Sequence, residues 1–422
     1  MPGDFISDYL IYADGSEVPP VFHRWSIITG LAAWLERSIH IPFGHSEIYP
    51  NIYCMLIGTA GTRKSTAIKL TKKLLSQAGY RNMAAEKTSK EKYLADLSAQ
   101  HDAVADPEDV LERNIWGDRE DAGDVYEHTP SFIAADEAND FFGIGNAEFL
   151  SLLGSLWDWN GKYENKTKHG KSDFIPNPTI SILAGNTPTG FALAFPPTIF
   201  GQGFFSRLLL IYGEPSGKRI TLPKTPGKDA TVEVVRRLQE IKLKSQGEFS
   251  LTSKGMMLLD MMYQNYKPSD DPRFDSFSNR RIIHLLKLCL VIAACKLQNT
   301  IDEYVLMQAN TYLTYAEKLM PKALGEFGRS KTADATHKIL ELINKSDAPV
   351  QLDQIWKHVM SDFTKTEELS TVIRNLSFAK KIQYISGAGY LPNKEVLESP
   401  YEKLGLIANS EFLTKEELGV SI

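Results

Sequence analysis

The sequence has few of the features that mark secreted or membrane proteins. Only three cysteines occur among the 422 residues, namely Cys54, Cys289 and Cys295. Their spacing argues against a disulfide framework or a zinc site. The most apolar stretch, 285–297, is interrupted by two lysines and is too short to span a bilayer. The first ten residues, MPGDFISDYL, have neither the basic start nor the apolar core of a secretory signal. We therefore expect a soluble, cytoplasmic protein without a membrane partner.

The composition shows no strong bias. The apolar fraction is 43% and the charged fraction 23%, values typical of a folded chain, which excludes disorder or a collagen-like sequence as the main interpretation. The length predicts two or three domains. The net charge of −5 is unevenly distributed, because residues 101–128 contain ten acidic residues and only two arginines. Nucleic acid remains a candidate partner, since its binding depends on local basic surfaces rather than on the total charge.

The first half of the chain alternates between apolar runs and helical spacing. Residues 20–43 show helical spacing, and a second helix is predicted over 65–78. Short apolar runs between breaking residues predict buried strands at 52–57, 131–135, 179–184 and 207–212. Strands that alternate with helices in this way indicate an α/β fold with a parallel sheet.

The second half is predominantly helical. After a linker near 213–228, helices are predicted over 229–246, 252–266, 278–297 and 302–322. A second linker, 325–334, leads to three short predicted helices at 336–344, 352–360 and 366–380. The alternating stretch IQYISGAGYLPN follows, with a glycine-centred turn. Three helices and a β-hairpin are the outline of a winged helix.

The loop after the first predicted strand has the composition of a phosphate-binding loop. It comprises Gly58, Thr59, Ala60, Gly61, Thr62, Arg63, Lys64, Ser65 and Thr66. This run resembles a Walker A motif, in which backbone N–H groups surround phosphate oxygens at a helix N-terminus. Lys64 would reach the β- and γ-phosphates, and the Ser65 hydroxyl would bind Mg²⁺. Arg63 stands where the usual glycine is expected, and a side chain is tolerated there if residue 63 has helical dihedral angles. A chance glycine-rich turn is the alternative.

Two further strands end in polar residues suited to ATP hydrolysis. The run FIAADEA ends in Asp136, a candidate Mg²⁺ ligand acting through water, and Glu137, which would polarise the attacking water. Asn186 follows the strand at 179–184 and suits contact with the γ-phosphate, because ligands lie at the carboxyl edge of open α/β sheets. The alternatives are acids that simply follow a strand and an asparagine that forms a turn.

Arg207 begins the apolar strand of FFSRLLLIY. Burying an arginine beside an apolar strand costs free energy unless its guanidinium binds an anion. The residue is therefore a candidate arginine finger that reaches the γ-phosphate of a neighbouring subunit. A structural salt bridge is the alternative.

Together, GTAGTRKST, FIAADEA, AGNTP and FFSRLLLIY resemble the AAA+ ATPases, in the helicase branch that includes minichromosome-maintenance and superfamily-three viral helicases. The stretches PPVFHRWSIITGLAAWL and EKTSKEKYLADL add a resemblance to phage and plasmid replication proteins linked to a primase. This resemblance implies an AAA+ core over 46–220, after a helical N-terminal segment, 1–45. A helical lid over 228–325, a winged helix over 332–395 and a tail over 396–422 would follow.

The resemblance also implies a pore hairpin and a lid arginine. The hairpin would lie within 160–178, where Lys166, Lys168, His169 and Lys171 are candidate DNA-binding residues; a solvated loop is the alternative. Arg280 or Arg281 would contact the γ-phosphate from the lid, with Arg280 favoured and ordinary surface arginines as the alternative. The acidic segment 101–128 is expected to be a solvated insertion.

These features predict an ATP- and Mg²⁺-dependent DNA helicase or translocase for phage or mobile-element replication. The resemblance implies a hexameric ring that acts on single-stranded or forked DNA, with a primase as a possible partner, in a bacterial or infected-host cytoplasm. The alternative function is a nucleotide-switched DNA- or protein-binding regulator, or a helicase loader, without unwinding activity. The winged helix combines acidic and basic residues around Arg374, so DNA contact and protein contact both stay open.

Overall fold

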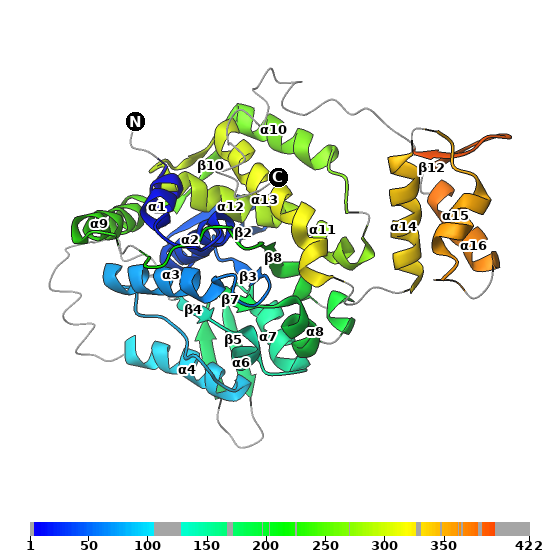
Figure 1. The fold of residues 1–422 in the computed structure, drawn as a ribbon. Helices are drawn as coiled ribbons and strands as arrows, with labels where there is room; N and C mark the ends of the chain where they lie inside the picture. Colours follow the sequence, from blue (N-terminus) through cyan, green and yellow to red (C-terminus); the bar gives the residue numbers. More distant parts are fainter. Residues whose placement is uncertain are drawn as a thin grey trace.

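The fold was analysed in a computed structural model (Figure 1). The structure describes residues 4–104, 128–166, 172–195, 197–201, 203–223, 226–269, 271–325, 331–346, 348–361, 363, 366–378 and 382–392. Most of the predicted acidic insertion, the predicted tail, and Lys168, His169 and Lys171 lie outside the described residues.

Four parallel strands form the central sheet, in the order β4-β7-β3-β8. They are β3 (Tyr53–Ile57), β4 (Thr129–Ala135), β7 (Pro178–Asn186) and β8 (Leu208–Tyr212). Every residue of β3 and β7 is buried, because both faces of the sheet are covered. This double burial explains why the strands are unbroken apolar runs instead of alternating patterns. The predicted parallel α/β sheet is confirmed.

Helices cover both faces of the sheet. On one face, α2 (Pro20–Leu35) packs across β3, β4 and β7, with α3 (Lys64–Ala78) beside it. On the other, the Tyr53 hydroxyl donates to the Leu153 carbonyl of α7 (Ala147–Leu156) at 2.8 Å. This layering leaves the two ends of the strands as the edges at which loops gather (Figure 1).

The helical spacing over 20–43 was only partly correct as a prediction. Helix α2 ends at Leu35, because Glu36 leaves the helical region with a positive φ of 52° and a ψ of −123°. Residues Ile39–Phe43 form β1 instead, in which Ile39 and Ile41 are buried and His40 is not, the period of a strand. Strand β1 pairs with β2 (Ser46–Ile48) and with the distant β9 (Gly247–Glu248), so its partners are partly long-range.

The four predicted helices after the sheet are confirmed, with shifted ends. They are α9 (Lys228–Lys244), α10 (Ser253–Gln264), α12 (Arg281–Cys295) and α13 (Glu303–Leu324). Helix α13 packs on β8 and α12, and α12 also packs on α2. The buried side chains of these helices and of the sheet form one continuous core. Across the described ranges, no helix is both long and apolar enough to cross a membrane.

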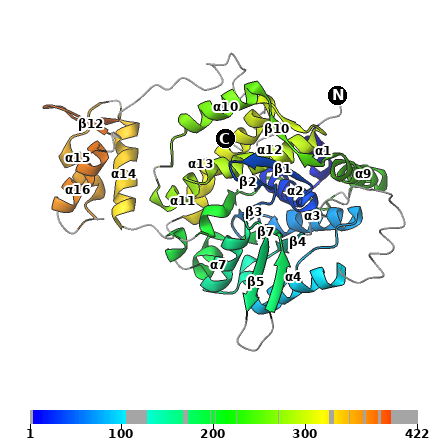
Figure 2. The ribbon, with the colours of Figure 1, turned by 180° about the vertical axis from the view of Figure 1, so that it is seen from behind.

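Shorter elements complete the main body. They are α1 (Phe5–Ala13), α4 (Lys90–Val104), α6 (Ala138–Phe142), α8 (Pro188–Ala194), α11 (Asp275–Ser278), β5 (Lys162–Lys166), β6 (Ser172–Pro176), β10 (Ser250–Leu251), β11 (Thr300–Ile301), η1 (Pro197–Gly201), η2 (Phe205–Arg207) and η3 (Pro272–Phe274). Arg207 therefore ends a 3₁₀ helix just before β8. The antiparallel β5–β6 hairpin lies below the central sheet in Figure 2, and its strand β6 packs against α4.

The last described part is a small unit with its own core. It consists of α14 (Lys331–Lys345), α15 (Leu352–Val359), α16 (Thr366–Phe378) and the antiparallel pair β12 (Ile382–Ile385) and β13 (Gly389–Pro392). Residue Val350 forms an additional bridge to Tyr390 of β13. Its buried side chains, among them Ile339, Ile355 and Val372, form a cluster separate from the main core. The three predicted helices and the hairpin are therefore present.

Candidate functional site

The predicted phosphate loop connects β3 to α3 at the carboxyl edge of the sheet. The chain passes very close to its neighbours at Gly58, where an added Cβ would lie 2.7 Å from the Gly213 carbonyl oxygen and 2.8 Å from Thr62 Oγ1. Only glycine fits there without a backbone shift. Gly61 has a positive φ of 84°, which turns the loop toward the start of α3. The two glycines thus allow a tight turn between β3 and α3.

Lys64 begins α3, and its side chain folds back into the loop. Its ammonium donates to the carbonyl oxygens of Gly58 (2.8 Å) and Thr59 (3.0 Å) and to Thr62 Oγ1 (3.2 Å). Burial lowers the pKa of Lys64, and the nearby charge of Glu137 raises it. The buried cation is held by neutral oxygens that a phosphate group can replace with a stronger, charged acceptor.

Arg63 departs from the expected dihedral angles. It caps α3 in a left-handed conformation, with φ 64° and ψ 24°, rather than the right-handed helical conformation that would accommodate a side chain easily. Glycine adopts this conformation at no steric cost, whereas an L-residue pays about 1–2 kcal/mol. The Arg63 guanidinium binds the Glu17 carboxylate, with an Nη2–Oε2 distance of 2.6 Å. The arginine is therefore tolerated through a specific partner.

Asp136 and Glu137 follow β4 at the same edge of the sheet. Asp136 Oδ2 lies 2.8 Å from Lys69 Nζ of α3, while its Oδ1 is buried without a hydrogen-bond partner among the described residues. A buried carboxylate oxygen with unused acceptor capacity fits a ligand of hydrated Mg²⁺. Glu137 precedes α6, and its effect on the pKa of Lys64 indicates that the two charges are close.

Asn186 is the last residue of β7 and lies opposite Ile57, directly beside the phosphate loop. Its side chain is buried: Nδ2 donates to Asn139 Oδ1 at 2.9 Å, and Oδ1 accepts from the Thr187 N–H at 2.9 Å. Asn139 of α6 was not identified from the sequence, although it lies two residues after Glu137. The contact links the Asn186 amide to the helix that follows the acidic pair.

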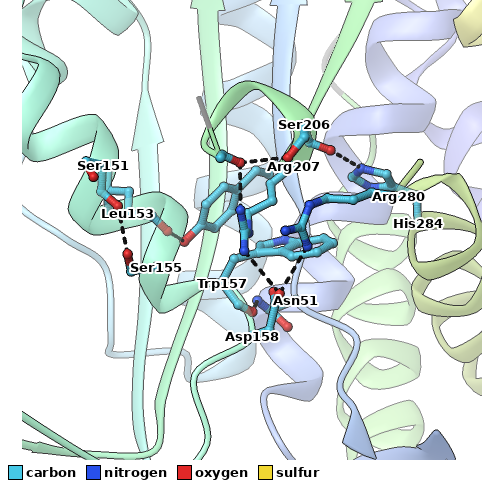
Figure 3. A network of polar contacts seen from close by, with 12 residues as sticks. Asn51, Ser151, Leu153, Ser155, Trp157, Asp158, Ser206, Arg207, Arg280 and His284 are labelled. Carbon is cyan, nitrogen blue, oxygen red and sulfur yellow. Dashed lines mark hydrogen bonds and ion pairs between the residues drawn. The ribbon is translucent and has the colours of Figure 1, made fainter. Parts of the chain in front are cut away.

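Arg207 lies at the opposite edge of the sheet from the loop. Leu208 pairs with Tyr53 at the start of β3, whereas Tyr212 pairs with Ile57 at its end. Four residues of strand separate these edges, about 13 Å at 3.3 Å per residue. The guanidinium donates to the Gly203 carbonyl (2.8 Å) and lies 3.3 Å from Asp158 Oδ2, and its Nε is buried and unpartnered among the described residues (Figure 3).

Arg280 and Arg281, the candidate lid arginines, do not contact the loop of their own chain within the described ranges. Arg280 Nη1 lies 3.3 Å from the same Asp158 oxygen that Arg207 contacts (Figure 3). Arg281 binds Glu317 Oε1 of α13 at 2.6 Å through its Nε. Their predicted contact with a γ-phosphate stays a prediction; Arg280 lies beside Arg207 at the amino edge of the sheet. Asp158, which contacts Arg207 and Arg280, was not identified from the sequence. No motif marks it there, since it simply lies just after the helix α7.

The β5–β6 hairpin occupies the predicted interval between the acidic pair and Asn186. Lys166, at the end of β5, is exposed, and its Nζ lies 3.3 Å from Glu164 Oε2. The other three predicted DNA-binding residues lie outside the described residues. The structure therefore provides the hairpin but describes only one of its four candidate side chains.

The structure brings the phosphate loop, Asp136, Glu137 and Asn186 together at one edge, and Arg207 and Arg280 together at the other. This division follows from the register of four parallel strands, in which all carboxyl ends share one edge. No protein-family model matches this chain, and no match was found among curated proteins.

Proposed function

We propose that this chain is a Mg²⁺-dependent P-loop ATPase of the AAA+ type, working as a ring-forming DNA helicase or translocase in phage or mobile-element replication. The observation that carries the proposal is the convergence of a buried lysine, an acidic pair and a strand-end asparagine around one glycine-rich loop. This set of groups suits positioning and charge stabilisation in phosphoryl transfer to water.

Each group has a separate task in ATP hydrolysis. The loop N–H groups and Lys64 bind the phosphate oxygens, and Lys64 compensates the negative charge that develops on them. Ser65 and Asp136 would hold Mg²⁺, which neutralises phosphate charge when it is bound. Glu137 accepts a proton from the attacking water, and Asn186 orients the γ-phosphate or that water.

The arginines at the opposite edge suggest a shared site. Arg207 lies at the edge of the sheet opposite the loop, and Asp158 holds Arg207 and Arg280 together there. In a closed ring with head-to-tail contacts, that edge would face the carboxyl edge of the next copy. Either arginine would then stabilise the charge on a neighbour's γ-phosphate, and a hexamer is the expected assembly.

The β5–β6 hairpin would contact the phosphate backbone of single-stranded or forked DNA inside the ring. The C-terminal unit of three helices and a hairpin, proposed as a winged helix, would add a DNA or protein contact. A primase encoded with the protein remains the proposed partner.

The test is ATP hydrolysis by the purified protein, with and without single-stranded DNA, beside Glu137→Gln. DNA-stimulated hydrolysis that the substitution abolishes, with nucleotide binding retained, is the expected result. Hydrolysis that is indifferent to DNA would instead favour a nucleotide-switched regulator or a helicase loader. A protein that neither binds nor hydrolyses ATP would refute the proposal.

A further inference from the structure

The carboxylate of Glu17 joins two segments that meet beside the phosphate loop. Its Oε2 accepts from Arg63 Nη2 (2.6 Å) and Nε (3.0 Å), and its Oε1 accepts from the Ile220 N–H (2.9 Å). One oxygen thus faces the loop, and the other faces residues 213–220, here named the strap. The Ile220 N–H, followed by Arg63, lowers the pKa of Glu17, so the group is charged at neutral pH.

The strap connects the loop to other parts of the main body. It leaves β8 beside the loop, where the Gly213 N–H donates to the Ile57 carbonyl at 3.0 Å. Its further contacts are Ser216 Oγ to the Glu17 carbonyl (2.6 Å), Lys218 Nζ to Asp14 Oδ1 (2.5 Å) and Lys322 Nζ of α13 to Glu214 Oε1 (3.2 Å). Glu17 is therefore the residue at which the loop, the strap and the N-terminal segment meet.

The contact between Glu17 and Arg63 matters because Arg63 has a left-handed backbone conformation. Residue 63 is the last of the loop before Lys64, and its left-handed dihedral angles set the direction of the N–H groups that lead into α3. Glycine adopts this conformation without steric cost, whereas arginine is strained in it. A charged pair with two donors on one carboxylate oxygen offsets that strain.

We propose that Glu17 is a positioning residue of the nucleotide site. It keeps Arg63 in the left-handed conformation that the phosphate loop needs, and it couples that conformation to the strap. This inference rests on the proposed nucleotide binding and extends it by naming a residue, outside the motifs, that sets nucleotide affinity. Glycine at position 63 would make Glu17 dispensable.

The test is equilibrium binding of a fluorescent ATP analogue with Mg²⁺ to the full chain. Glu17→Ala should weaken the Kd by roughly 2- to 5-fold, the loss expected for an ion pair whose guanidinium is 55% exposed. Adding Arg63→Gly to Glu17→Ala should restore most of the affinity, because glycine removes the cost of the left-handed conformation. Arg63→Gly alone should bind at least as tightly as the wild type. Asp14→Ala is the matched control, since it breaks a strap contact and leaves the Arg63–Glu17 pair intact.

A purely structural role for Glu17 would not be rescued by a glycine in the loop. Unchanged affinity in Glu17→Ala, or failure of Arg63→Gly to restore it, would overturn the inference while wild-type binding leaves the proposed function intact. A loss in Asp14→Ala as large as that in Glu17→Ala would also overturn it, because the strap would then be the cause. A wild-type protein that binds no nucleotide would remove both proposals.

Discussion

The Asp158 carboxylate contacts two arginines at the amino edge of the sheet, and the contribution of these two ion pairs to stability can be measured. Its Oδ2 lies 3.3 Å from Arg207 Nη2 and 3.3 Å from Arg280 Nη1. The side chains are 13% exposed for Arg207, 34% for Arg280 and 46% for Asp158, so the pairs lie between buried and solvent-exposed ones. Hydrogen bonds to buried charged groups contribute about 1.5–3 kcal/mol, and exposed pairs contribute about 0.2–1 kcal/mol.

Because the shared carboxylate is about half exposed, each pair contributes about 0.5–1 kcal/mol to the free energy of unfolding. Asp158→Asn keeps the shape of the side chain but removes the charge, and it leaves two guanidinium groups facing each other. Their proximity is already evident, because burial and then the charge of Arg207 lower the pKa of Arg280. We expect Asp158→Asn to lower the free energy of unfolding by about 1–2 kcal/mol, and the Tm by about 1–3 °C.

Thermal unfolding of the full chain measures this loss. In an Arg207→Met/Arg280→Met background, Asp158→Asn should have almost no effect, since its partners are gone. Glu233→Gln, which changes a surface pair with Arg236, is the matched control and should leave the Tm nearly unchanged. An unchanged Tm in Asp158→Asn, or an equal fall in the double-methionine background, would refute the reasoning.

Three further predictions address the loop, the core and the hairpin. Gly58→Ala should weaken binding of a fluorescent ATP analogue roughly tenfold, because the added Cβ would lie 2.7 Å from the Gly213 carbonyl oxygen; retained affinity would contradict this. Burial lowers the pKa of His284 to about 3. Below about pH 6.5 the unfolded chain therefore binds a proton that the folded chain does not. As the pH is lowered further, the free energy of unfolding should fall by up to about 1.4 kcal/mol for each pH unit. His284→Gln should flatten that slope in urea titrations between about pH 4.5 and 7, and an unaltered slope would exclude His284 as its source. Combined alanine substitution of Lys168, His169 and Lys171 should abolish strand displacement and spare nucleotide binding, and unchanged unwinding would remove the pore-hairpin assignment.

Local sequence was sufficient for the sheet strands and for the residues around the loop. Strands buried on both faces must be apolar at every position, so β3 and β7 stand out as short runs between breaking residues. Gly58, Gly61 and Lys64 meet backbone and charge requirements that are set within a few residues, and a sequence shows such requirements directly.

The tertiary structure determined which distant residues pair and at which edge of the sheet each functional side chain lies. Local spacing over 20–43 suggested a helix, yet β1 forms between the nearby β2 and the strand β9, which lies some two hundred residues further along the chain. The pairs Arg63–Glu17, Arg207–Asp158 and Asn186–Asn139 join residues that are distant in the sequence, and no spacing rule connects them. Strand order and register alone place Arg207 at the edge opposite Lys64. Residue types therefore determined which chemistry is available, whereas long-range pairing determined which groups share one site, because the contacts that close a fold depend on where distant segments meet.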